Sequence, residues 1–205
     1  MKPGANIIFS TAARAGSGGV ETAARDDYQT PPDLFAALDA EFYFDLDAAA
    51  DAENALGSSY GGPRYIDAAM DALQTSWGGD RWWPAKIRSV FCNPPYSLID
   101  PFVRRAVEQA RAHDLTVVLL VPARTGRAIW RTHVWGVAHE IRFISGRLRF
   151  GLPDKATASA TFDSAVVVYR GRQRLGRTEC LWIDRQGQEI AAVPLRAQDG
   201  ETEGV

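Results

Sequence analysis

Residues that bind metals or form disulfide frameworks are scarce in this sequence. It has two cysteines and three histidines in 205 residues, and Cys92 and Cys180 lie far apart and match no metal-binding spacing. We therefore expect no bound metal and a reduced, cytoplasmic compartment.

Long apolar runs and a dinucleotide-binding glycine pattern are also absent. No stretch approaches the roughly 20 apolar residues that cross a membrane, and Ile7-Ile8-Phe9 is too short for the core of a secretory signal. No GxGxxG pattern supports a dinucleotide site. The 46% hydrophobic content instead predicts one α/β domain with a full core and no membrane partner.

The formal net charge of −2 conceals a strong asymmetry along the chain. Residues 1–80 carry a net charge of −9, residues 81–177 a net charge of +11, and residues 178–205 a net charge of −4. An asymmetry of this size is a hint of polyanion binding. The alternative is that the arginines are spread over a solvated surface, which the sequence alone leaves open.

The hydrophobic pattern divides the chain into three segments. Residues 1–25 are rich in Ala, Gly, Ser and Thr without a sustained apolar period, which predicts a flexible N-terminal arm. Residues 26–177 alternate between helical and strand patterns. Residues 178–205 predict a terminal β-hairpin followed by a frayed tail.

Within residues 26–177, apolar periodicity predicts helices and buried strands in alternation. Thr30 is expected to cap a first helix, a second helix opens at Asp100-Pro101, and a third at Arg127. Strands are predicted near residues 42–50, 90–92, 115–121, 140–144 and 164–169, and residues 151–161 are predicted to form a polar loop.

One turn carries the clearest chemical signal. Val90-Phe91-Cys92 is typical of the end of a buried strand, and Pro94 and Pro95 stop it. A residue before proline is kept out of the helical region, so Asn93 is extended or in a turn, and Pro94 leaves its carbonyl free. The sequence thus predicts a rigid turn at the carboxyl end of a strand, where open α/β sheets bind ligands.

This Asn93-Pro94-Pro95-Tyr96 turn resembles the catalytic motif of S-adenosylmethionine-dependent methyltransferases that modify exocyclic or amide nitrogens. Two acceptors, the Asn93 side-chain oxygen and the Pro94 carbonyl, would hold both hydrogens of an adenine N6 amine and turn its lone pair toward the methyl group. Tyr96 would stack on the base. A plain strand-ending turn with an Asn cap is the structural alternative.

Five motifs in order extend the resemblance over about residues 26–170. They are Asp-Asp-Tyr-Gln-Thr-Pro-Pro-Asp-Leu-Phe, Phe-Asp-Leu-Asp-Ala-Ala-Ala, Asp-Ala-Leu with Trp77, Asn-Pro-Pro-Tyr-Ser and Gly-Arg-Leu-Arg-Phe. Together they look like the phage-type Dam family of DNA N6-adenine methyltransferases. The resemblance implies a Rossmann-like class I methyltransferase fold, with a mostly parallel twisted sheet and helices on both faces, and S-adenosylmethionine as cofactor.

The resemblance also implies a set of cofactor-binding residues. They lie in the motifs before and at the turn: Thr30, Pro31, Asp47, Ala48, Asp71, Leu73 and Asn93. Local alternatives remain open, because Asp47 also suits the cap of a following helix, Asp71 suits the surface and Trp77 suits the core. Ala48-Ala49-Ala50 stands where many methyltransferases have a glycine-rich loop.

Double-stranded DNA is the expected partner, and the basic loops supply the candidate contacts. These are Arg81, Trp82, Arg124, Arg147, Arg149 and Phe150. No separate target-recognition domain is evident. Methylation of a protein glutamine or an RNA base, and a catalytically inactive DNA-binding relic of the fold, remain as alternative functions.

Overall fold

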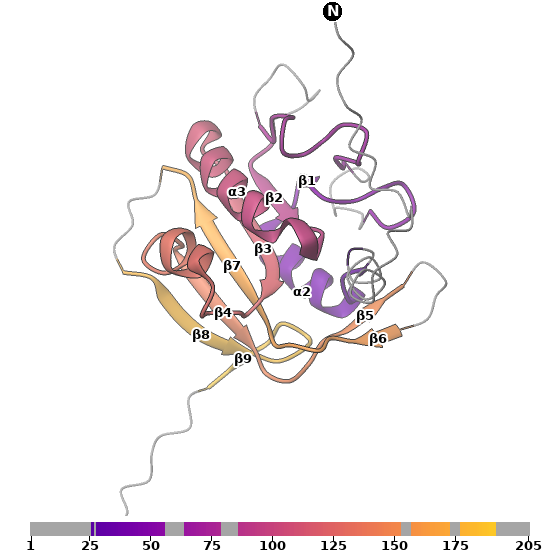
Figure 1. Cartoon of the computed structure of the whole chain (residues 1–205), viewed down its shortest axis with the longest axis vertical. Helices are drawn as coiled ribbons and strands as arrows, with labels where there is room; N and C mark the ends of the chain where they lie inside the picture. Colours follow the sequence, from indigo (N-terminus) through magenta and orange to yellow (C-terminus); the bar gives the residue numbers. More distant parts are fainter. Residues whose placement is uncertain are drawn as a thin grey trace, which may run out of the picture.

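A seven-stranded sheet with helices on both faces forms the body of the molecule (Figure 1). The computed structural model describes residues 26, 28–55, 64–78, 86–152, 157–172 and 177–191. The strand order is β1-β2-β3-β7-β4-β8-β9. In that order the strands are Leu46–Asp47, Ser89–Cys92, Thr116–Pro122, Ser164–Arg170, Glu140–Ile144, Glu179–Ile183 and Glu189–Ile190.

Most of these strands point the same way. β1 pairs with β2 and β2 with β3 in parallel, whereas β7 runs antiparallel to both β3 and β4. The carboxyl ends of β1, β2 and β3 therefore meet at one edge of the sheet, where ligands bind in open α/β folds. The α/β class is confirmed, and so are the predicted strands near residues 90–92, 115–121, 140–144 and 164–169. The strand predicted near residues 42–50 is limited to Leu46–Asp47, because Phe42 still belongs to α2, and β3 has one parallel and one antiparallel neighbour.

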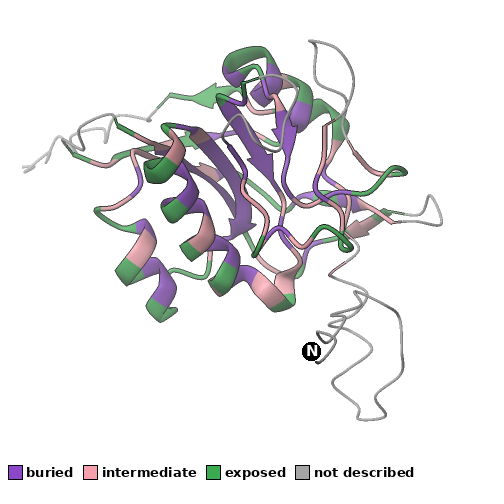
Figure 2. Cartoon of the chain, turned by 90° about the horizontal axis from the view of Figure 1, so that it is seen from above, coloured by how far each residue is buried: buried purple, intermediate pink, exposed green. Residues whose placement is uncertain are grey.

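The two long helices cover opposite faces because the strand residues alternate between them. Val90, Val117 and Val167 face the core beneath α3 (Ile99–His113). Their neighbours Phe91, Val118 and Val166 belong to the second core beneath α2 (Pro32–Phe42). Figure 2 shows the buried strands enclosed between exposed helix surfaces on both sides.

The start of α2 differs from the prediction. Pro31, with φ −56° and ψ 128°, is the N-cap residue, and no side chain caps the helix. Thr30 is buried instead. Prolines suit the first positions of a helix because the missing N–H has no intrahelical partner there, so this helix begins without the predicted threonine cap.

The polar loop predicted after Gly151 also differs from the structure. It contains the strand β6 (Thr157–Ser159), which pairs with β5 (Arg149–Gly151). Gln29 adds to this small sheet through two backbone hydrogen bonds with Gly151, both 3.0 Å. The partner lies more than 100 positions away in the chain, so local sequence patterns do not predict the pairing.

The terminal hairpin is part of the main sheet. β8 and β9 form the predicted antiparallel pair, and β8 pairs in parallel with β4 from Glu140↔Glu179 to Ile144↔Ile183. None of the helices in the described part of the chain is long and apolar enough to cross a membrane.

Candidate active site

Asn93 lies at the carboxyl end of β2 with a free acceptor atom. Its Nδ2 donates a 2.9 Å hydrogen bond to the Tyr28 carbonyl oxygen, which fixes the orientation of the amide. Its Oδ1 is buried and has no hydrogen-bond partner among the described residues. A buried acceptor without a partner costs about 1–3 kcal/mol, and a cost retained in a folded protein is a reason to look for a ligand.

A group of aromatic rings borders Asn93, and we call it the aromatic cluster: Tyr28, Tyr96, Phe150 and Phe162. Tyr28 stacks on Phe150 with ring centroids 4.8 Å apart, and Tyr96 meets Tyr28 edge-on at 5.6 Å. Phe162 contacts the ring of Tyr96 at 5.1 Å. The Tyr96 hydroxyl is buried without a described partner, and burial raises the pKa of this phenol. Tyr96 thus stays neutral in an apolar wall.

The segment around residue 28 is hydrogen-bonded to the Asn-Pro-Pro-Tyr turn. Asp26 Oδ1 accepts a 2.8 Å hydrogen bond from the Ser97 backbone N–H. Two residues on, the Tyr28 carbonyl accepts from Asn93. This segment therefore positions both ends of the turn.

Asp47 lies one strand away from Asn93. The register pairs Asp47 with Phe91, so Asn93 is two positions further along the adjacent strand, roughly 8 Å away between Cα atoms. Burial, with a smaller contribution from Asp51, raises the Asp47 pKa to about 7, while the Ala49 N–H on its Oδ1 opposes the rise. Residues 48–55 contain no helix, so the alternative that Asp47 caps a following helix is wrong.

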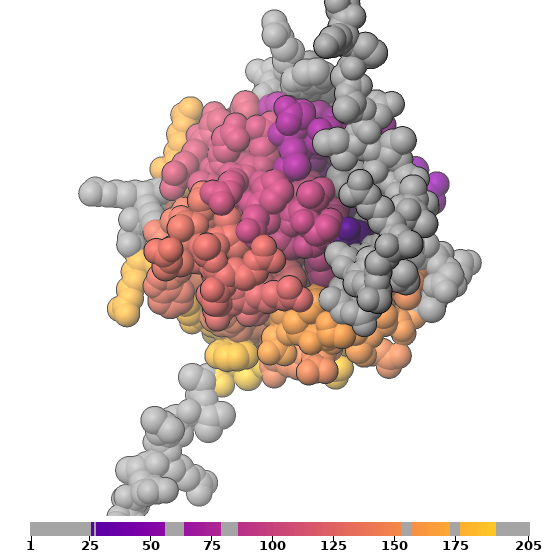
Figure 3. Space-filling view, viewed as in Figure 1, coloured from indigo at the N-terminus to yellow at the C-terminus, as the bar shows by residue number. Residues whose placement is uncertain are grey.

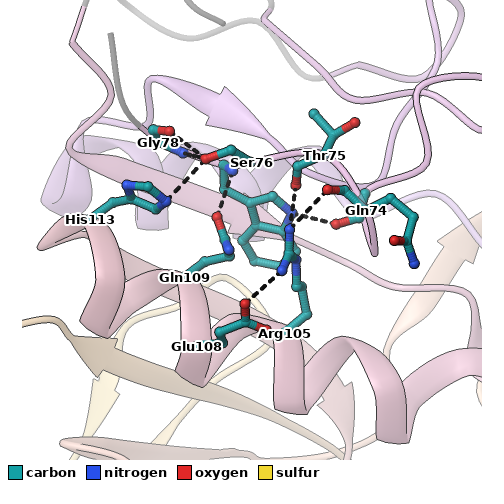
Figure 4. A network of polar contacts seen from close by, with 10 residues as sticks. Gln74, Thr75, Ser76, Gly78, Arg105, Glu108, Gln109 and His113 are labelled. Atoms are coloured by element: carbon teal, nitrogen blue, oxygen red, sulfur yellow. Dashed lines mark hydrogen bonds and ion pairs between the residues drawn. The ribbon is translucent and has the colours of Figure 1, made fainter. Parts of the chain in front are cut away.

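Asp71 and Leu73 come directly before residues 74–78, which side chains of α3 hold in place (Figure 4). Asp71 has a left-handed backbone with φ 52°, and its Oδ1 accepts from the Leu73 N–H at 3.0 Å. Arg105 donates to the carbonyl oxygens of Gln74 and Thr75, and Gln109 accepts from the Trp77 N–H at 2.8 Å. Trp77 is fully buried, so it belongs to the core.

The candidate DNA contacts fall into three groups. Arg124, Arg147 and Arg149 are exposed, and Arg124 lies over the Phe162 ring at 4.9 Å. Phe150 is 0% exposed, so its ring is a wall of the aromatic cluster and not a surface contact, because the alternation that exposes Arg149 buries its neighbour. Arg81 and Trp82 lie outside the described residues.

Three residues of the site were not predicted, namely Asp26, Tyr28 and Phe162. Asp26 and Tyr28 stand within the first motif, so their nearness to Thr30 was the available signal. Phe162 gave no signal, because only the pairing of distant strands brings it to Tyr96. Among the described residues, no group of three or more His, Cys, Asp or Glu side chains is arranged to hold a metal.

The fold is an open α/β sheet, and two neighbouring strand ends carry a free amide acceptor and a buried carboxylate. Proteins of this class bind small ligands beyond the carboxyl ends of their strands. The family model described as DNA N-6-adenine-methyltransferase (Dam) matches residues 18–178, and the chain belongs to this family. The expected family is thereby confirmed.

Individual proteins are also similar to this chain. The DNA N-6-adenine-methyltransferase of Escherichia phage T1 is 35% identical over 127 residues, which are 62% of this chain and 48% of the phage protein. The chain thus spans about half the length of this relative. The crystal structure of a putative RNA methyltransferase from Pyrococcus horikoshii has a TM-score of 0.43 at 14% identity, covering 72% of this chain and 87% of that chain.

Proposed function

We propose that this chain transfers a methyl group from S-adenosylmethionine to the N6 amine of an adenine in duplex DNA. The observation that carries the proposal is the buried, unpartnered Oδ1 of Asn93 at the carboxyl end of β2. Membership of the Dam family and the similarity to the phage enzyme support adenine in DNA as the substrate.

Asn93 and Pro94 have the central role in this proposal. The Asn93 Oδ1 and the Pro94 carbonyl accept one N6 hydrogen each, which turns the nitrogen lone pair toward the methyl donor. The Tyr28 carbonyl prevents the amide from flipping, because it accepts from Asn93 Nδ2. Fixed acceptors of this kind lower a barrier by positioning and electrostatics, and no strong general base is required.

The aromatic cluster provides the place for the base. A base inside a duplex is out of reach of Asn93, so the adenine has to leave the stack. Tyr96 is half-buried and neutral, which suits a ring that packs on the extruded base. Phe150 and Phe162 hold Tyr96 in place from two sides.

The residues at the strand ends fit the expected cofactor. Asp47 is buried and forms no ion pair with a described residue, and its burial raises the pKa of the carboxyl group. The amine of an amino acid would supply a cationic partner. We assign Asp47 and Ala48, with Thr30 and Pro31, to the amino-acid end, and Asp71 and Leu73 to the adenosine end. When bound, S-adenosylmethionine supplies an electrophilic methyl group on a sulfonium.

The proposed reaction balances without a further reactant. A carbon–nitrogen bond forms at N6 as the sulfur–carbon bond of the donor breaks, and one N6 proton leaves to water. Asn93 Oδ1 and the Pro94 carbonyl accept hydrogen bonds from N6 until that proton departs.

Incubation with methyl-labelled S-adenosylmethionine and unmethylated duplex DNA tests this proposal. After digestion to nucleosides, we expect the label in N6-methyldeoxyadenosine, formed at least about a hundredfold more slowly by the Asn93→Ala variant. Parallel samples of RNA and of a glutamine-containing peptide are the matched controls. Label in either control but not in DNA would show that the substrate class is wrong.

A further inference from the structure

Positive side chains gather on the surface formed by α3 and the π-helix η2 (Trp130–Val134), which we call the α3–η2 surface. Arg104 and Arg111 are seven residues apart on α3, so they share a helix face, and both are exposed. Exposed Arg131 and partly exposed His133 come from η2. Figure 3 shows α3 and the segment after β3 side by side on one face of the molecule.

These arginines differ from their neighbours, because no described acidic side chain pairs with them. Arg105 pairs with Glu108, and Arg127 pairs with Asp100. By contrast, no carboxylate in the described ranges forms an ion pair with Arg104, Arg111 or Arg131. The positive charge of the surface is therefore uncompensated within the described structure.

The cations of α3 and η2 also lie close to one another. Arg104 Nη1 is 3.4 Å from His133 Nε2. Partial burial lowers the His133 pKa, and the charges of Arg104 and Arg111 lower it further. The guanidinium groups of Arg104 and Arg111 both influence the His133 imidazole. The side chains of α3 and η2 therefore form one continuous positive region.

An exposed aromatic ring borders the same region. Trp135 follows η2 directly and is 63% exposed, although tryptophan is usually among the more buried residues. Its backbone leaves the helix with ψ 121° while its N–H bonds to the Trp130 carbonyl. π-helices are rare in proteins, and the single turns that do occur are often found at functional sites. Free cations beside an exposed indole ring are the combination that nucleic-acid surfaces use.

We propose that the α3–η2 surface is a second DNA contact, which binds backbone phosphates of the duplex beside the target adenine. This inference rests on the proposed function. α3 begins three residues after Tyr96, so its rise of about 1.5 Å per residue puts Arg104 and Arg111 about 8 and 18 Å along it. The two arginines are thus about 10 Å apart along the helix, the length of about three base pairs at roughly 3.4 Å each.

The salt dependence of DNA binding tests this assignment. In the double variant Arg104→Ala/Arg111→Ala, we expect a higher Kd for unmethylated duplex DNA. The slope of log K against log salt should flatten by about two, since each phosphate contact contributes roughly 0.9. Lys86→Ala/Arg88→Ala is the matched control, because it removes two exposed cations that precede β2. Its slope should equal that of the wild type.

Trp135→Ala provides an independent measurement. Loss of an uncharged contact should weaken binding while the salt slope stays unchanged. Thermal unfolding of each variant identifies any that are misfolded.

Equal slopes for the double variant, its control and the wild type would overturn the inference, as would a wild type that binds no DNA. Methylation of DNA with unaltered slopes would contradict only this inference, whereas DNA binding without methylation would contradict only the proposed function.

Discussion

At the scale of single residues, the site depends on one buried polar atom that has no hydrogen-bond partner among the described residues. Asn93 uses its donor for the Tyr28 carbonyl and keeps its acceptor free. A structural asparagine that merely capped the strand would have its acceptor satisfied by a neighbouring N–H. The unpartnered oxygen therefore favours a ligand over a cap.

The variant Asn93→Ala should reduce kcat by a hundredfold or more, about 3 kcal/mol, because the lost acceptor acts chiefly in the transition state. The midpoint of thermal unfolding should change little, since loss of the bond to Tyr28 is offset by removal of an unsatisfied acceptor. DNA affinity should largely survive. Near-normal turnover combined with a large loss of stability would show that Asn93 is structural.

The buried carboxylate of Asp47 predicts a dependence of stability on pH. Its pKa is raised from 3.8 to about 7 in the folded protein. The folded state thus keeps a proton that the unfolded state has lost, so stability falls as pH rises from about 4 to about 7. In Asp47→Asn this fall should be absent, a difference of at most about 4 kcal/mol at pH 8. Denaturant unfolding at several pH values measures it.

Asp47→Asn should also weaken S-adenosylmethionine binding, because the cofactor's ammonium would meet a neutral amide. For the unaltered protein, the affinity should rise with pH up to about 7, as binding then requires loss of the Asp47 proton. Calorimetry in buffers of different ionisation enthalpy detects the released proton. An affinity that is unchanged by the substitution, with only stability affected, would remove Asp47 from the cofactor site.

At the scale of elements, α3 acts both as a core helix and as a clamp on residues 74–78. Its apolar side packs on the sheet, while Arg105, Gln109 and His113 face that segment (Figure 4). Ser76 Oγ lies 3.1 Å from His113 Nε2, which adds a contact near the end of the helix. The position of Asp71 and Leu73 therefore depends on α3.

Replacement of Arg105 by Ala should release this clamp. The Arg105 side chain is 14% exposed, and it donates hydrogen bonds to two backbone carbonyl oxygens. In the variant these oxygens would lose that donor. We expect the free energy of unfolding to fall by about 2 kcal/mol and the Kd for S-adenosylmethionine to rise. Arg88→Ala, which removes an exposed arginine, is the control for lost charge. An unchanged Kd in a destabilised Arg105→Ala protein would separate the clamp from the cofactor site.

At the scale of the whole molecule, the sheet brings together loops that are far apart in the sequence. Arg147 and Arg149 are exposed on one side of an extended segment whose other side buries Leu148 and Phe150. Arg149 Nη2 donates to Thr157 Oγ1 at 3.1 Å across the β5–β6 hairpin, and neither arginine has an ion pair to a described carboxylate. Both are available to phosphate.

Changing both Arg147 and Arg149 to Ala should raise the Kd for DNA and flatten the salt slope by roughly two, one unit per lost contact. Cofactor affinity should not change. If the arginine stems serve only to pack on the sheet, the protein should be less stable and the slope unaltered. Combination with Arg104→Ala/Arg111→Ala should flatten the slope additively if both surfaces contact one duplex.

Much of this protein follows from local sequence. The two prolines after Asn93 force a turn at the strand end because they exclude helical backbone and remove N–H donors. The 3.6-residue period of α3 and the continuous apolar runs of β3 and β7 identify these elements without knowledge of their partners. The five motifs in order were sufficient to predict the family.

Only the tertiary structure decided which groups meet. The pairing of Gln29 with Gly151, the orientation of Asn93 by Tyr28 and the approach of Phe162 to Tyr96 all join distant parts of the chain. Phe150, an expected DNA contact, is instead a buried core residue. Burial also raises the pKa of the Asp47 carboxyl group. Local periodicity determines backbone conformation, whereas the environment of a side chain depends on strand order and register, which long-range packing sets.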